Sequence, residues 1–149
     1  MGEIVIAPME QHHLDEVLAI EESSFTTPWS RDALERELTE NTLAVYIVAT
    51  EDGRVVGYAG MWHVVTEGHI TNVAVTETCR RRGIAGMMLK WLLDTAEHRG
   101  MMGVTLEVRI TNAAAQRLYT KYGFKPEGFR KQYYTDTKED AVIMWKYFM

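Results

Sequence analysis

The chain has 149 residues, a formal net charge of −5 and a single cysteine, Cys79. Its content of 46% hydrophobic and 25% charged residues is ordinary for a globular protein, and the length predicts one domain over residues 1–149. One cysteine excludes an internal disulfide and a multi-cysteine zinc site, and the acidic balance argues against generic binding to nucleic acid or to anionic membranes.

Residues 3–7 show only a weak alternation, which predicts a short first strand. Leu14, Val17 and Leu18 then recur at helical spacing and predict an amphipathic helix over residues 10–23. Residues 25–29 break this pattern. Ser30 follows as an N-cap residue, which predicts a second helix ending near Glu40.

Three strands follow, at residues 43–50, 54–64 and 69–75. The first pair is joined by residues 51–53, in which Asp52 and Gly53 form a hairpin signal. A second turn is expected at residues 66–68. Short turns between neighbouring strands predict an antiparallel meander.

From Gly83 the hydrophobic period changes to that of a helix, which ends at Gly100. One face of it carries Ile84, Met87, Met88, Trp91, Leu92, Thr95 and Ala96. We expect Met87, Met88, Met101 and Met102 to fill the core.

The last third of the chain predicts a strand over residues 104–109, because apolar and polar residues alternate there. Asn112 can cap a helix that runs through Tyr122 to Gly123. Two strands at residues 124–134 and 141–148 complete the order β-α-α-β-β-β-α-β-α-β-β, which is a mixed α/β sheet.

The segment before Gly83 is the most informative, because three consecutive arginines precede a glycine that opens a helix. The free N–H groups and partial positive charge of a helix N-terminus suit a phosphate. The loop is neither a G-x-x-x-x-G-K-[ST] loop nor a G-x-G-x-x-G fingerprint, so nucleoside triphosphates and dinucleotides lose support. A solvated basic loop before an ordinary helix is the alternative interpretation.

Arg80-Arg81-Arg82-Gly83-Ile84-Ala85 matches the [Q/R]-x-x-G-x-[G/A] loop of the GCN5-related N-acetyltransferases. Further segments resemble the RimI branch of that family, the bacterial ribosomal-protein-alanine N-acetyltransferases. They are Phe25-Thr26-Thr27-Pro28-Trp29-Ser30, Asn72-Val73-Ala74-Val75, Leu106-Glu107-Val108-Arg109, Asn112-Ala113-Ala114-Ala115, Leu118-Tyr119, Tyr122-Gly123-Phe124, Tyr133-Tyr134 and Glu139-Asp140-Ala141.

The resemblance implies a single-domain fold of about seven strands and about four helices, with acetyl-CoA as cosubstrate and no metal. It implies that acetyl-CoA is bound by Val73, Ala74, Val75, Arg81, Arg82, Gly83, Ile84, Ala85, Gly86 and Asn112. Glu107 would be the general base and Tyr119 the general acid. The peptide would enter between Phe25, Pro28 and Trp29 on one side and Tyr133 and Tyr134 on the other. The implied acceptor is the N-terminal alanine of a basic ribosomal small-subunit protein.

Acid–base chemistry agrees with an α-amine as the acceptor. At pH 7 about a tenth of an α-amine is neutral, whereas deprotonating a lysine costs roughly 3 kcal/mol more. A glutamate acting through water could therefore suffice as the base, and a phenol could protonate the departing thiolate.

Each candidate residue also has a structural interpretation. Glu107 could be a solvated strand residue, Tyr119 a packing tyrosine, Tyr133 and Tyr134 edge-strand packing, and Asn112 only a helix cap. The histidines show no metal-ligand spacing with Cys79, and nothing places a base beside Cys79 to make it a nucleophile.

Two other functions remain open at this point. One is an acetyltransferase for protein lysines or small amines, and the other is a non-catalytic acetyl-CoA-binding module. No basic, apolar leader and no run of roughly eighteen apolar residues is visible, so we expect a cytoplasmic protein without nucleic-acid or membrane partners.

Overall fold

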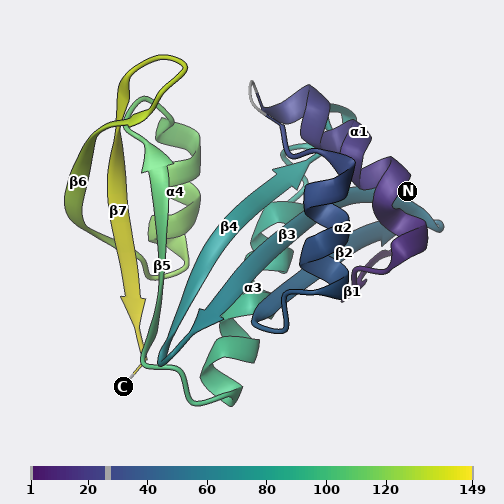
Figure 1. Ribbon diagram of the computed structural model, residues 1–149, viewed down its shortest axis with the longest axis horizontal. Coiled ribbons are helices and arrows are strands. Elements are labelled where there is room, and N and C mark those ends of the chain that lie inside the picture. The colour runs from purple at the N-terminus through teal and green to yellow at the C-terminus, as the bar shows by residue number, and fades with distance from the viewer. Residues whose placement is uncertain (1, 26–27, 149) are drawn as a thin grey trace.

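The computed structural model describes residues 2–25 and 28–148. A seven-stranded sheet with the strand order β1-β2-β3-β4-β5-β7-β6 organises the molecule (Figure 1). Its strands are β1 (Ile4–Pro8), β2 (Ala44–Glu51), β3 (Arg54–Val64), β4 (Glu67–Val75), β5 (Gly103–Arg109), β6 (Lys125–Tyr134) and β7 (Glu139–Tyr147). The helices are α1 (Leu14–Ser24), α2 (Arg31–Thr39), α3 (Ile84–His98) and α4 (Ala113–Lys121). The predicted mixed α/β fold and the predicted order of its elements are confirmed.

Two separate cores lie on opposite faces of the sheet, because neighbouring side chains of a strand point to opposite faces. In β2, Ile47 and Ala49 join the core beneath α3. Tyr46 and Val48 join the core beneath α1 and α2. The central strands are therefore buried on both faces.

The caps that the sequence predicted form as expected. The Ser30 hydroxyl accepts a hydrogen bond from the Ala33 N–H at 3.1 Å, and the Asn112 side chain accepts one from the Ala115 N–H at 3.1 Å. Such caps stabilise a helix by about 1 kcal/mol each. They place the beginnings of α2 and α4 where the sequence predicted them.

The turn between β3 and β4 differs from the prediction. Glu67 and Gly68 pair with Val64 and His63 inside the strand ladder, so the turn consists of Val65 and Thr66. Val65 adopts a φ of 54°, a conformation that β-branched residues rarely adopt. Sequence patterns place turns at glycine, and here the pairing of the long strands overrides that preference.

The predicted buried face of α3 is correct in part. Met88 is fully buried, whereas Met87 is 40% exposed. The helix presents Ile84, Met88, Leu89, Leu92, Leu93 and Ala96 to the sheet. Met101 is buried and Met102 is 59% exposed, so the expectation that Met87 and Met102 fill the core was wrong.

Strands β4 and β5 run parallel and pair only at their beginnings. The paired residues are Glu67 with Gly103, Gly68 with Val104 and His69 with Thr105. Beyond these pairs the two strands diverge, as Figure 1 shows. Among the described residues, the divergence leaves one edge of β4 from residue 70 onward without a strand partner, beside the N-terminus of α3.

Within the described residues, no helix is both long enough and apolar enough to cross a lipid bilayer.

Candidate functional site

Two adjoining cavities occupy the divergence between β4 and β5. The first, here called the α3 cavity, has a volume of about 410 Å³ and lies at the N-terminus of α3. The second, here called the β4–β5 cavity, has a volume of about 290 Å³. Both are lined by Val73, Ala115 and Tyr119. A ligand could therefore extend from one cavity into the other past Tyr119.

The loop before α3 has the backbone conformation of an anion cradle. Arg81 and Gly83 adopt positive φ values of 65° and 79°. The first hydrogen bond of the helix runs from the Met87 N–H to the Gly83 carbonyl, so the preceding N–H groups are free to bind a ligand. A Cβ atom added at Gly83 would have no neighbour within 4 Å, which shows open space above the loop.

Most of the residues predicted to bind the cofactor meet at this cavity. Its lining includes Val73, Ala74, Val75, Arg81, Gly83, Ile84, Ala85 and Gly86. Arg82 lies outside both linings, because its guanidinium donates to both carboxylate oxygens of Glu51 at 3.1 and 2.5 Å. Arg80 lines the cavity instead, and its Nε donates to the Val75 carbonyl at 3.1 Å. A run of three arginines cannot reveal which of them folds back onto the protein.

A β-bulge shapes the wall between the two cavities. The register of β3 against β4 shifts between Gly60 and Met61, which leaves Thr71 as an extra residue. As a result, Ile70 and Val73 both contact the core beneath α3, although they are three positions apart in the strand. Thr71, Asn72 and Val73 thereby all line the β4–β5 cavity.

Glu107 is held in a polar pair rather than solvated. Its Oε2 lies 2.8 Å from Nε2 of His69, and its Oε1 lies 3.7 Å from Nε of Arg130. The hydrogen bond from His69 holds the pKa of Glu107 below its usual range. The sequence pattern did not indicate His69, which pairs with Thr105 of β5, two positions before Glu107.

Tyr119 lies on α4 where the two cavities meet. Its ring contacts Phe124 edge-on, with 5.8 Å between the ring centroids. Burial raises its pKa to about 12, so the phenol keeps its proton at neutral pH. Tyr119 is therefore a packing residue and also has a position suited to a proton donor.

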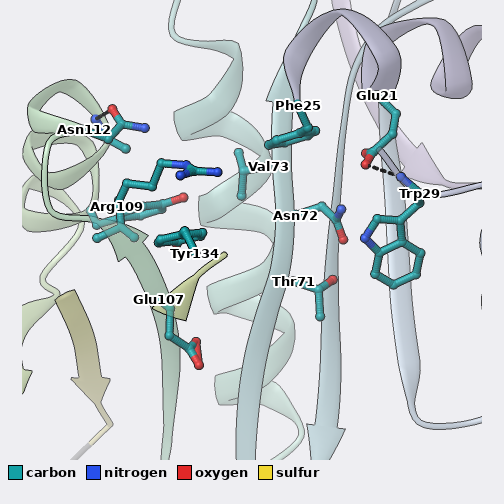
Figure 2. Close-up of a pocket in the computed structure, with 13 residues that line it drawn as sticks. Glu21, Phe25, Trp29, Thr71, Asn72, Val73, Glu107, Arg109, Asn112 and Tyr134 are labelled. Carbon is teal, nitrogen blue, oxygen red and sulfur yellow. Dashed lines mark hydrogen bonds between the residues drawn. The ribbon is translucent and has the colours of Figure 1, made fainter. Parts of the chain in front are cut away.

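The two predicted tyrosines of β6 differ in position. Tyr134 lines the β4–β5 cavity, whereas Tyr133 lies outside the lining and is 43% exposed. The Arg109 guanidinium lies 4.1 Å from the centroid of the Tyr134 ring (Figure 2). Arg109 also binds both carboxylate oxygens of Asp136 at 3.1 and 2.8 Å. It thus fixes the β6–β7 loop, a role that the sequence did not indicate.

The segment between α1 and α2 contributes Phe25 and Trp29 to the same cavity. Pro28 does not line it, and Thr26 and Thr27 of the predicted loop lie outside the described residues. Asn112 lines the cavity and also caps α4, so a cap and a binding role are compatible.

Glu21 and Asn72 also line this cavity, and the sequence did not indicate a site role for either. Both are buried, with 1% and 6% exposure. Oε2 of Glu21 accepts the Trp29 N–H at 2.8 Å, and burial raises the Glu21 pKa above its usual value (Figure 2). The available signal was a carboxylate on the buried stripe of α1, one turn after Val17.

Comparison with known proteins assigns the family. Residues 14–124 match the model of the acetyltransferase (GNAT) family. The chain is 41% identical to the putative [ribosomal protein bS18]-alanine N-acetyltransferase of Bacillus subtilis (strain 168), over 92% of this chain and 91% of that one. It is 34% identical to the [ribosomal protein bS18]-alanine N-acetyltransferase of Escherichia coli (strain K12), over 93% and 94% of the two chains.

Solved structures agree with this assignment. The crystal structure of the Escherichia coli ribosomal-protein-S18-alanine N-acetyltransferase superposes with a TM-score of 0.88 at 32% identity, covering 97% of this chain and 94% of that chain. The crystal structure of Ard1 from Thermoplasma volcanium also gives a TM-score of 0.88, at 28% identity and 98% coverage of both chains. The chain therefore belongs to the acetyltransferase (GNAT) family and is an acetyl-CoA-dependent N-acetyltransferase, as its motifs predicted.

Proposed function

We propose that the enzyme acetylates the α-amino group of an N-terminal alanine on a ribosomal small-subunit protein. The relatives named above act on an alanine of ribosomal protein bS18, and they match the chain over more than nine-tenths of its length. The observation that carries the proposal is the meeting of two cavities at Tyr119, one at a helix N-terminus and one with Glu107 in its wall. Such an acceptor places the reaction in the cytoplasm.

The α3 cavity fits the phosphate-bearing arm of acetyl-CoA. Free N–H groups at the start of α3 and the Arg81 side chain would bind the pyrophosphate, since both favour negative charge. The unpaired edge of β4 at Val73, Ala74 and Val75 offers backbone groups to the amides of the pantetheine arm. When bound, acetyl-CoA supplies the acetyl group as a thioester. The proposed binding of acetyl-CoA by these side chains and backbone groups requires no metal.

Glu107 and Tyr119 supply the proton transfers. Glu107 accepts a proton from the acceptor amine through a bound water. Its lowered pKa makes it a weak base, and a weak base suffices because an α-amine loses its proton near pH 8. Tyr119 donates its phenolic proton to the departing thiolate, a role that its burial supports by keeping the phenol neutral. Asn112 would contact the cosubstrate from the start of α4.

The acceptor peptide would enter between the two polar walls of the β4–β5 cavity. Phe25 and Trp29 bound the space for the first residue on one side, and Tyr134 bounds it on the other. Tyr133 and Pro28 would contact the later residues of the peptide, outside the cavity. A chain with a net charge of −5 is compatible with a basic partner.

Mass spectrometry of acetylated peptides tests the proposal. A peptide that begins with alanine and contains one lysine should gain one acetyl group, at its α-amine. The same peptide with a blocked α-amine should react poorly, since a lysine costs roughly 3 kcal/mol more to deprotonate.

The other two functions give different results in the same assay. Acetylation of the lysine with a free α-amine left unmodified would support a lysine or small-amine acetyltransferase. Binding of acetyl-CoA without turnover on any amine would contradict catalysis altogether.

A further inference from the structure

Two buried oxygen atoms at the β4–β5 cavity have no hydrogen-bond partner among the residues that the structure describes. They are Oε1 of Glu21 and Oδ1 of Asn72, each with almost no accessible surface. The two residues line the same cavity although they come from a helix and from a strand. Buried oxygens of this kind are rare in native proteins, because leaving an acceptor unpaired is unfavourable.

The fold holds both side chains in place. The backbone N–H of Trp29 donates a hydrogen bond to Oε2 of Glu21 and so fixes the carboxylate. Its second oxygen, Oε1, stays available to another donor. Asn72 pairs with Gly60, and a Cβ atom at Gly60 would point at the Tyr46 ring in the core beneath α1 and α2. The bulge at Thr71 therefore directs Asn72 to the sheet face that α1 covers. Figure 2 shows Glu21, Trp29 and Asn72 gathered on this side of the cavity, with Arg109, Tyr134 and Glu107 on the other.

The missing partner must be a donor, and the charges around the cavity indicate a cation. Glu21 and Glu107 both contribute carboxylates to the wall, whereas the Arg109 guanidinium is bound by Asp136 and Glu139. The remaining titratable groups of the lining, Tyr119 and Tyr134, are neutral phenols with a pKa raised to about 12. Glu107 already has His69 and Arg130 at its two oxygens.

We propose that Glu21 and Asn72 form a subsite for the α-ammonium group of the incoming peptide, opposite Glu107. This rests on the proposed function, and it adds the residues that capture the amine before its deprotonation. An ammonium group has three N–H donors, so it can satisfy both oxygens and keep one donor directed toward the cavity. Glu21 is ionised in this complex, because the cation offsets the burial that otherwise raises its pKa.

The subsite should act on binding more than on chemistry. A carboxylate stabilises the charged amine, which promotes capture but does not help the amine to lose its proton. Loss of Glu21 should therefore raise the KM for peptide while kcat changes little. The KM for acetyl-CoA should stay unchanged, since Glu21 does not line the α3 cavity.

A binding cycle between protein and peptide tests the subsite without relying on turnover. Calorimetry in the presence of CoA compares two peptides. One begins with alanine, and in the other a propanoyl group, which is an alanyl group without its α-amine, replaces that alanine. Removing the amine should weaken binding to the wild-type enzyme about ten- to hundredfold, as expected for a charge-assisted hydrogen bond. In Glu21→Gln the two peptides should bind with similar affinity. Glu22→Gln is the matched control, because Glu22 is an exposed carboxylate on the same helix.

The outcomes separate the subsite from a structural role. Equal weakening of both peptides by Glu21→Gln would overturn the subsite and leave Glu21 as a support of the Trp29 segment. If Glu21→Gln fails to fold, Asn72→Ala takes its place in the same cycle. The criterion is the same: removing the amine from the peptide should weaken binding less in the variant than in the wild-type enzyme. If the wild-type enzyme neither binds nor acetylates an N-terminal peptide, the proposed function fails and the subsite with it. If the enzyme acetylates the α-amine, but removing the amine weakens binding equally in the wild-type enzyme and in Glu21→Gln, the subsite alone is overturned.

Discussion

Nε2 of His69 lies 2.8 Å from Oε2 of Glu107, and this contact joins β4 to β5 at the point where the pairing of the two strands ends. The contact keeps Glu107 oriented at a cavity that would otherwise let its side chain rotate. It also sets the electrostatics of the proposed base, because the hydrogen bond from His69 lowers the pKa of Glu107.

Replacement of His69 by alanine should change the pH dependence of the enzyme. Without its hydrogen-bond donor the Glu107 carboxylate is less stabilised, so its pKa rises. The acidic limb of kcat/KM should move to higher pH, and a pH–rate profile measures it. His98→Ala, at the exposed end of α3, should leave the limb in place. An unmoved limb in His69→Ala would show that Glu107 is not the titrating base.

Tyr119→Phe should lower kcat by about 10²-fold or more, the usual contribution of a general acid. The stability of the variant should change little, since the ring and its contact with Phe124 remain. Single-turnover kinetics with acetyl-CoA and an alanine peptide measure the chemical step. Tyr147→Phe serves as the control, because Tyr147 is an exposed tyrosine whose hydroxyl binds Glu127. Equal rates for the two variants would remove Tyr119 as the acid.

Gly83→Val should abolish binding of acetyl-CoA. Valine at a φ of 79° is strained by about 1–2 kcal/mol, and its side chain would extend into open space over the proposed phosphate site. Gly100→Val is the matched control, because Gly100 has a φ of 77° and equally open surroundings at the far end of α3. The two variants should lose a similar amount of thermal stability. Only Gly83→Val should lose affinity for acetyl-CoA, which calorimetry measures. Loss of affinity in both would point to a general defect of α3.

Cys79→Ala should keep most of the activity. Cys79 is 9% exposed in the core beneath α3, so its truncation should cost about 1 kcal/mol of stability without touching the reaction. Mass spectrometry of the intact protein after mixing with acetyl-CoA checks for an acetylated thiol. We expect the acetyl group to pass directly from acetyl-CoA to the amine, so an acetyl group on Cys79 that is passed on to the peptide would contradict this mechanism.

Arg109→Lys should raise the KM for peptide several-fold. Lysine cannot reproduce the two-point contact with Asp136 or lie flat over the Tyr134 ring, so the β6–β7 loop would lose its anchor. Steady-state kinetics measure the change, with Arg117→Lys on the exposed face of α4 as the control. An unchanged KM would mean that Arg109 does not order the peptide entrance.

Local sequence signals determined the order of the elements, the caps at Ser30 and Asn112, and the position of the Gly83 loop. These features depend on contacts within one or two turns, so periodicity and cap residues suffice to predict them. The family resemblance indicated Glu107 and Tyr119, which the fold brings to the walls of one cavity.

Only the tertiary structure decided how these elements meet. The pairing of β4 with β5 ends at His69, and the bulge at Thr71 turns Asn72 toward Glu21. Arg82 folds back onto Glu51, which lies 31 residues earlier in the chain. Contacts of this kind depend on strand register and on partners distant in the chain, and a one-residue shift in register would reverse the face of every side chain in the strand. The local pattern of residues therefore carries no signal for them.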